Sequence, residues 1–324
     1  MSQQRINTKK LIKNILKGDI SSLSKAITLC ESKLENEQKI AQIIIAAFSE
    51  KNGNSIRIGV TGVPGVGKST FINSFGKMLT SKGKKVAVLA IDPTSEKTQG
   101  SILGDKSRMD ELATDKNAFI RPSPSAGTLG GVANKTRENI ILCEAAGFDV
   151  ILIETVGVGQ SETTVSNLVD FFLLLMLAGA GDELQGIKRG IMEMADVILI
   201  NKADGDNVQK AKNAMLQYKS ALHLFPAMQN GWIAQVSTCS ALEKIGLEEI
   251  WETIEKHNSQ MKENSFFTKN RKEQNIYWLH SQIKEELGNK KYSQLRTNGE
   301  LKKLEKKLLN KKATIYQLLE DLNL

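Results

Sequence analysis

The sequence has few cysteines and no long hydrophobic run. Its three cysteines, Cys30, Cys143 and Cys239, are far apart and form no CxxC pair, which argues against a disulfide framework or zinc knuckle and favours a reducing compartment. The strongest apolar run, 171–180, has about half of the ~20 residues that a membrane-spanning helix needs. The N-terminus lacks the apolar core of a secretory signal. We therefore expect a cytoplasmic protein without a membrane segment.

Aromatic residues are also scarce, at 5% of the chain, and no basic run carries the interleaved aromatics of a base-stacking surface. The net charge is +8, and most of the surplus Lys and Arg follows Lys256. A solvated helical face explains such a tail, and so does a surface for an anionic partner. The first explanation is simpler, and we expect no nucleic-acid partner.

What the sequence does contain is a long alternation of short β-branched runs with amphipathic stretches. A helical pattern covers 8–49, and Lys- and Glu-rich helical patterns follow Gly246. Near-continuous apolar strands separated by helices are typical of a mostly parallel sheet in a three-layer α/β/α fold. The strands are expected at 56–60, 86–91, 150–153, 171–177, 197–200 and 233–236.

The last helical pattern carries a heptad seam. Lys311 interrupts it at a core position. We expect this seam to pack either on the N-terminal helices of the same chain or in a homodimer arm, and the pattern favours neither. Its members are Leu301, Leu304, Leu308, Ile315, Leu318 and Leu322.

A phosphate-binding loop follows the first expected strand. Residues 62–69 match G-x-x-x-x-G-K-[ST] in full, and a helical pattern comes next. Backbone N–H groups of such a loop face one anion, Lys68 reaches the β- and γ-phosphates, and the Ser69 hydroxyl binds Mg²⁺. The motif predicts a P-loop NTPase fold, but it separates neither ATP from GTP nor hydrolase from kinase. The predicted loop residues are Gly62, Val63, Pro64, Gly65, Val66, Gly67, Lys68, Ser69 and Thr70.

Guanine selection is predicted at an NKxD tetrad, 201–204, after the strand 197–200. The Asp204 carboxylate can accept both the N1–H and the 2-amino hydrogens of guanine, which adenine does not offer. Asn201 is expected to bind the phosphate loop and the Lys202 stem to cover the base. A weaker match follows the last expected strand, where a backbone N–H would meet guanine O6; it comprises Ser240, Ala241 and Leu242.

Acidic residues at strand ends predict the Mg²⁺ and γ-phosphate site. Glu154 ends the strand 150–153, and the Gly157 N–H three residues later can sense a γ-phosphate. Asp92 follows the strand 86–91 and is placed to hold Mg²⁺ or orient water, as is Asp105, for which a helix cap is the alternative role. Together with Lys68 these acids form the predicted catalytic set. No glutamine occupies the usual water-orienting position, so we expect slow turnover that a partner completes.

Longer motifs resemble one family, the methylmalonyl-CoA mutase-associated GTPases, also labelled arginine/ornithine transport kinases. The resemblance spans about 51–251, and it is carried by 62–70, 92–95, 121–131, 154–162 and 182–190. It implies a homodimeric GTPase that binds adenosylcobalamin-dependent methylmalonyl-CoA mutase or a related acyl-CoA mutase, gates cofactor loading and protects the mutase from inactivation. The implied domains are a helical extension in 1–50, a GTPase domain in 51–257 and a dimerisation arm in 258–324.

The same resemblance assigns further roles. It implies that Ser69, Asp92, Asp105 and Glu154 jointly hold Mg²⁺. It also implies that a switch loop relays the nucleotide state to the mutase through Asp182, Gln185 and Lys188, a stretch that otherwise reads as a solvated polar loop.

Three other functions fit parts of the pattern. A metallochaperone GTPase shares the Glu-type acid and the NKxD tetrad, but it should show a Cys/His cluster, whereas His223, His257 and His280 lie far from any cysteine in the sequence. A kinase would need a second substrate cleft, and Asp204 does not suit ATP. A scaffold that binds nucleotide without turnover is the third alternative.

Overall fold

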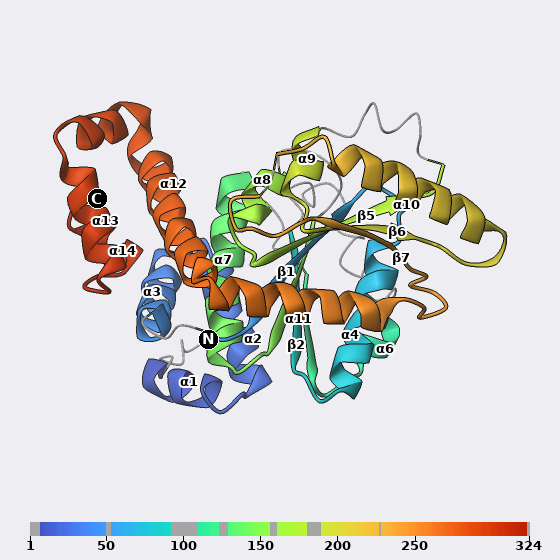
Figure 1. Ribbon diagram of the computed structural model, residues 1–324. Coiled ribbons are helices and arrows are strands. Elements are labelled where there is room, and N and C mark those ends of the chain that lie inside the picture. Colours follow the sequence, from blue (N-terminus) through green and yellow to red (C-terminus); the bar gives the residue numbers. More distant parts are fainter. Residues whose placement is uncertain are drawn as a thin grey trace. The chain divides into compact units, whose positions relative to one another are not determined.

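The computed structural model describes residues 7–49, 53–91, 109–122, 129–155, 161–179, 189–226 and 228–322, and these divide into two compact units (Figure 1). We call residues 1–54, 133–148 and 269–324 the helical unit, and residues 55–132 and 149–268 the sheet unit. The three-part division with boundaries at 50 and 257 stays a prediction. No helix among the described residues is long and apolar enough to cross a membrane.

The sheet unit contains seven parallel strands in the order β3-β2-β4-β1-β5-β6-β7. The predicted α/β/α fold with a mostly parallel sheet is therefore confirmed. The bounds of β2 and β5 agree with the sequence prediction, whereas β7 begins two residues later than predicted. The strands are β1 (Ile56–Gly62), β2 (Val86–Ile91), β3 (Ala118–Arg121), β4 (Val150–Thr155), β5 (Phe171–Leu177), β6 (Val197–Asn201) and β7 (Gln235–Thr238).

The strand β3 was missed by the sequence prediction. It has four residues, ends in an arginine and lies at the edge of the sheet, where only Phe119 is buried. Such a short strand carries too few apolar positions for a period-2 pattern to stand out.

Helices pack against both faces of the sheet because its central strands, β4, β5 and β6, are almost wholly apolar and buried. Helices α4 and α11 pack together, as do α8 and α9, and α10 packs on β6 and β7 (Figure 1). The helices are α4 (Lys68–Ser81), α6 (Asp110–Ala113), α8 (Ser161–Ser166), α9 (Arg189–Met194), α10 (Val208–Leu222) and α11 (Leu247–Glu263), with a 3-10 turn, η1 (Gly205–Asn207).

The strand order places the predicted motifs at one edge of the sheet. The central strand β1 lies between β4 and β5, with Val60 in register with Glu154 and Gly62 with Leu175. In the same way β6 pairs with β7, so the segments that follow Asn201 and Thr238 leave the sheet side by side. Parallel strands thus bring the carboxyl ends of β1, β4, β6 and β7 together, which is where α/β sheets bind their ligands.

The helical unit combines N-terminal and C-terminal segments of the chain with most of one internal helix. Polar contacts join α12 to α7: the Asn134 Nδ2 donates to Glu285 Oε2 at 2.8 Å, and Arg271 Nη1 lies 3.2 Å from Glu144 Oε1. The helices are α1 (Thr8–Ile15), α2 (Ile20–Glu31), α3 (Glu35–Ser49), α7 (Leu129–Ala145), α12 (Phe266–Thr297), α13 (Glu300–Leu309) and α14 (Ile315–Glu320).

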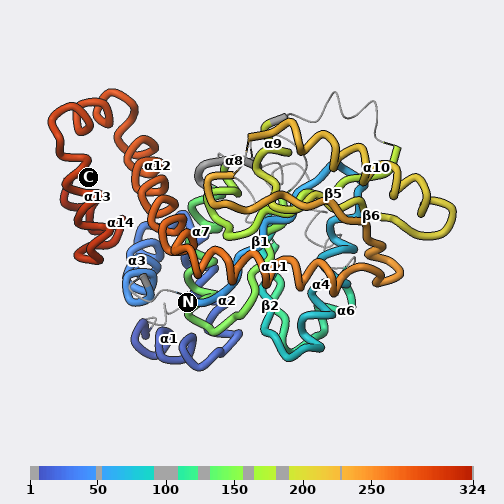
Figure 2. Tube along the Cα trace, in the orientation of Figure 1, coloured from blue at the N-terminus to red at the C-terminus, as the bar shows by residue number. Residues whose placement is uncertain are grey.

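The predicted heptad seam does not lie on one helix. The chain turns after α13 with Lys311 in the left-handed region at φ 54°, and α14 then begins with a capping box between Thr314 and Gln317 (Figure 2, red). Leu301 and Leu304 of α13 are buried, as are residues Ile315 and Leu318 of α14. The two helices pack together as a helical hairpin, and these four apolar positions are buried within one chain.

All three cysteines are free and buried, as expected from their spacing. Cys30 of α2 hydrogen-bonds Glu138 of α7, and Lys135 Nζ lies 3.6 Å from Glu138 Oε2. Glu138 is almost completely buried, and this burial raises its pKa from 4.5 to about 7 despite the nearby lysine. The carboxyl group is thus protonated in the folded unit under mildly acidic conditions.

Replacing this carboxyl should change how the helical unit responds to pH. Because the folded pKa lies above the unfolded value, the folded state binds the proton more tightly, and wild-type stability falls as the pH rises from about 4.5 to about 7. Glu138→Gln should remove this dependence and stabilise the unit by up to about 3 kcal/mol at pH 8. Amide hydrogen exchange of α7 between pH 5 and pH 8 measures the pH dependence of its stability, and Glu300→Gln, at an exposed position, is the control. Equal pH slopes in wild type and Glu138→Gln would contradict this assignment.

Candidate nucleotide site

The phosphate loop connects β1 to α4 and depends on glycine at two close approaches. Gly67, the N-cap of α4, has φ 91°, and a Cβ there would lie 2.9 Å from Asn201 Nδ2. Gly62 has φ 153°, and its Cβ would lie 2.4 Å from the Leu175 carbonyl oxygen. Both positions therefore exclude larger side chains, and the loop curls as a phosphate cradle requires.

Lys68 folds back over this loop from the first turn of α4. Its Nζ donates to the Gly62 carbonyl at 2.9 Å and to the Val63 carbonyl at 3.3 Å. The ammonium group is thus held beside the loop, next to the backbone N–H groups at the start of the helix. Positive charge from the lysine and from the helix N-terminus converges there, which is the electrostatic setting of an anion site.

Ser69 and Glu154 lie together at the ends of α4 and β4. The Ser69 hydroxyl donates to Glu154 Oε1 at 3.2 Å, and Glu154 is only 7% exposed. Beside them the Thr155 hydroxyl donates to the Thr61 hydroxyl at 2.8 Å, which joins β4 to β1. A hydroxyl and a buried carboxylate are the hard oxygen ligands that Mg²⁺ prefers. The donor set present therefore fits a magnesium ion.

Asn201 joins three parts of the site. Its Nδ2 donates to the Val66 carbonyl of the phosphate loop at 2.8 Å, which is the contact expected from the sequence. Its Oδ1 accepts from the Ala241 N–H at 3.1 Å and from the Cys239 thiol at 3.3 Å. One buried amide thus holds the end of β6, the phosphate loop and the segment after β7 in fixed relation.

The expected base-binding residues also gather at this point. The Ser240 hydroxyl donates to Asp204 Oδ2 and accepts the Glu243 N–H at 3.1 Å. Lys202 has φ 59°, a left-handed backbone that the Asn207 side chain supports by donating to the Lys202 carbonyl at 2.7 Å. The tetrad therefore forms a tight turn that directs the Asp204 carboxylate toward the segment after β7.

The residues 239–242, which follow β7 beside Asp204, differ in exposure and polarity. Burial, with a smaller contribution from the Asp204 carboxylate, raises the pKa of the Cys239 thiol to about 12, so this thiol stays neutral. Ser240 and Ala241 are buried, whereas Leu242 is 71% exposed. An apolar side chain thus projects from the loop whose backbone was predicted to meet guanine.

Several predicted residues lie outside the described residues. They are Asp92, Asp105 and Gly157 near the expected γ-phosphate, and Asp182, Gln185 and Lys188 of the expected switch loop. Their roles stay predictions.

Ser74 is a supporting residue that sequence reasoning missed. Its hydroxyl donates to the Ala241 carbonyl at 2.6 Å, and both residues are buried. The helix that follows the phosphate loop therefore also holds the segment 239–246 between β7 and α11, which we call the base loop. The available signal was a small polar residue on the apolar side of α4, between Phe71 and Phe75.

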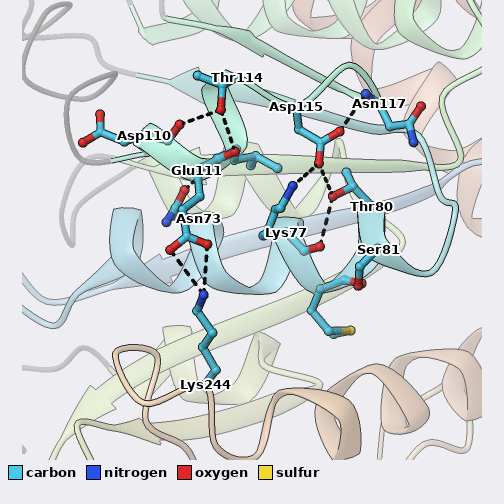
Figure 3. Close-up of polar contacts among 12 residues, drawn as sticks. Asn73, Lys77, Thr80, Ser81, Asp110, Glu111, Thr114, Asp115, Asn117 and Lys244 are labelled. Carbon is cyan, nitrogen blue, oxygen red and sulfur yellow. Dashed lines mark hydrogen bonds and ion pairs between the residues drawn. The ribbon is translucent and has the colours of Figure 1, made fainter.

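A second polar group joins α4 to α6 and the base loop (Figure 3). The Asp115 carboxylate accepts a hydrogen bond from Lys77 Nζ at 2.6 Å and another from the Thr80 hydroxyl at 2.8 Å. The hydrogen bond from Lys77 is the main reason that the pKa of Asp115 is lowered to about 2. On the other side of α6, Lys244 Nζ lies 2.9 Å from Glu111 Oε2. The base loop and α6 are thereby attached to the same helix.

Comparisons with known proteins agree with this geometry. The family described as Methylmalonyl Co-A mutase-associated GTPase MeaB matches residues 23–296. The chain is 48% identical to GTPase ArgK of Escherichia coli over 86% of this chain and 84% of that protein. It is 44% identical to the mitochondrial methylmalonic aciduria type A homolog of Mus musculus over 85% of this chain and 69% of that protein.

A solved structure matches the whole fold. The crystal structure of a LAO/AO transport system kinase superposes with a TM-score of 0.77 and 36% sequence identity, and the match covers 100% of both chains.

Proposed function

This chain belongs to the methylmalonyl-CoA mutase-associated GTPases, and we propose that it is a nucleotide-dependent chaperone of an adenosylcobalamin-dependent acyl-CoA mutase. In this role it gates loading of the cofactor and protects the mutase from inactivation. The observation that carries the proposal is the family match over 23–296, which includes the phosphate loop, Glu154 and the NKxD tetrad. GTP hydrolysis is the shared activity of the family, and the mutase is the partner that the family name states.

The residues of the phosphate loop, the NKxD tetrad and the base loop each have a role in the proposed nucleotide site. Lys68 and the N–H groups of the loop bind the β- and γ-phosphates, and Asp204 selects guanine. A backbone N–H of the segment 240–242 meets guanine O6, and the stem of Lys202 and the exposed Leu242 cover the base. The short distance between Ser69 and Glu154 supports these two as Mg²⁺ ligands, completed by Asp92 and Asp105. Mg²⁺ supplies charge neutralisation at the phosphates.

The remaining roles concern communication with the mutase. We place the γ-phosphate sensor at Gly157 and the relay to the mutase at Asp182, Gln185 and Lys188. Without a water-orienting glutamine, turnover is slow until the partner completes the site. We further propose that the protein acts as a homodimer in the cytoplasm, which rests on the family resemblance.

Cofactor loading tests the proposal directly. Apo-mutase is mixed with adenosylcobalamin and this protein in the presence of GTP, GDP or a non-hydrolysable GTP analogue, and formation of holo-mutase is followed by the cobalamin absorption spectrum. The expected result is loading that depends on which nucleotide is present. Gln185→Ala and Lys188→Ala should weaken this dependence while basal GTP hydrolysis stays near wild type. Identical loading with and without the protein under every nucleotide would remove the chaperone role.

A further inference from the structure

Helix α13 carries its positive charge on one side. Lys302, Lys303, Lys306 and Lys307 are all exposed, and we call these four residues the lysine face. At 100° per residue their positions cover an arc of about 140° on the helix. One side of α13 is therefore a compact array of ammonium groups.

The opposite side of α13 is fixed against its own chain. Leu301 and Leu304 are 3% and 6% exposed in the hairpin core. Glu305, at the border of this apolar side, lies 2.9 Å from His280 Nε2 on α12, and the other ring nitrogen of His280 lies 3.2 Å from the Tyr292 hydroxyl. These contacts set the rotation of α13 about its axis, so the lysine face is held outward.

The described residues neutralise only part of this charge. Residues 290–312 contain nine Lys and Arg but only two Glu. Lys307 pairs with Asp321 at 2.9 Å, whereas Lys302, Lys303 and Lys306 form no ion pair with any described residue. Like charges four positions apart weaken a helix, so the arrangement lowers the stability of α13, and among the four lysines only Lys307 is paired within the described part of its unit.

The lysine face lies outside the family match, which ends at residue 296, before α13 begins. None of the four lysines belongs to the phosphate loop or the NKxD tetrad, so nucleotide binding gives no reason for this concentration of charge.

We propose that the lysine face of α13 is a docking surface that guides an acidic face of the client mutase to this GTPase. The inference rests on the proposed function, because it names the surface through which that partner is met. Flexible lysines act as point charges that accelerate encounter with a carboxylate-rich surface over a long range. Such steering raises the association rate and weakens with salt.

The composition of the face disfavours other anionic partners. It holds no arginine to clamp phosphates in two-point contacts and no aromatic ring to stack on bases. Insertion into a lipid surface needs an exposed apolar side, and the apolar side of α13 is buried in the hairpin. A protein surface rich in Asp and Glu is the remaining partner of matching charge.

A charge reversal with a matched control tests this surface. The variant Lys302→Glu/Lys303→Glu/Lys306→Glu is compared with Lys9→Glu/Lys10→Glu/Lys13→Glu, which changes the same net charge at exposed positions of α1 in the same unit. Association with the mutase is measured by stopped flow at about 20 mM and about 0.5 M salt, where the Debye length is roughly 20 Å and 4 Å. GTP hydrolysis without mutase should be unchanged in both variants.

The α13 variant should associate at least about tenfold more slowly than wild type at low salt and equally fast at high salt. The α1 variant should stay within about twofold of wild type. If the charge reversal unfolds the hairpin, the neutral variant Lys302→Gln/Lys303→Gln/Lys306→Gln is measured instead. Its association rate at low salt should also fall below wild type, by a smaller factor.

Three results would overturn the inference while leaving the GTPase and its client in place. They are an unchanged association rate in the α13 variant, an equal loss in the α1 variant, and a loss that persists at high salt. Charge-dependent binding of duplex DNA or of phosphatidylserine vesicles, with an unaffected mutase rate, would assign the face to another partner. Wild-type protein that never binds the mutase would remove the proposed function and this inference with it.

Discussion

Lys68→Ala should weaken GTP binding by about a hundredfold or more and leave the fold intact. In the structure the Lys68 ammonium group lies against the Gly62 and Val63 carbonyls, beside the start of α4. Each charge-assisted hydrogen bond to a phosphate contributes roughly 1.5–3 kcal/mol, so loss of the Lys68 contacts to the β- and γ-phosphates accounts for a loss of this size. Isothermal titration with GTP measures the loss.

The matched control is Lys82→Ala, at the other end of the same helix. Lys82 Nζ lies 3.2 Å from Glu248 Oε2, a surface pair of small energetic weight. This variant should bind GTP like wild type, and both variants should melt close to wild type without nucleotide. Unchanged GTP affinity in Lys68→Ala would show that the loop does not bind phosphate as described.

Asp204→Asn should convert a guanine site into one that prefers xanthine. The Asp204 carboxylate accepts the Ser240 hydroxyl and is directed toward the base loop. An amide cannot accept both the N1–H and the 2-amino hydrogens of guanine, but its own N–H can donate to the 2-oxo group of xanthine. Because an unmatched buried polar group is strongly rejected, the affinity ratio of GTP to XTP should change by at least about a hundredfold.

Competition between GTP and XTP for a fluorescent nucleotide measures this ratio. Asp206→Asn is the control, since it makes the same chemical change two residues away at an exposed position of η1. It should keep the wild-type preference. An Asp204→Asn protein that still discriminates fully against XTP would mean that guanine is selected elsewhere.

Much of this site was predictable because its residues follow buried strands. An apolar run such as 197–200 predicts a buried strand, here β6, and a polar tetrad directly after that strand must lie at the carboxyl edge of the sheet. The same reasoning placed Glu154 at the end of β4 and the phosphate loop at the end of β1. The link from Asn201 to the phosphate loop was expected, and it is observed at 2.8 Å.

Other contacts depend on packing that a pattern does not encode. Ser74 reads as an ordinary helix residue until α4 is placed beside the base loop. Likewise, Asp115 binds Lys77 across 38 residues of sequence, and nothing local indicates that pair. The heptad seam was read as one helix because its spacing continues through 310–314, whereas the left-handed Lys311 and the Thr314 cap end one helix and start another.

Steady-state hydrolysis of GTP and of ATP by the purified protein, alone and with adenosylcobalamin-dependent methylmalonyl-CoA mutase, tests most directly whether this chain is a guanine-specific GTPase that serves the mutase. We expect slow turnover of GTP, none of ATP, and a sharp rise in GTP turnover when the mutase is added. Equal turnover of ATP would contradict the guanine site. GTP turnover that is indifferent to the mutase would contradict the proposed client.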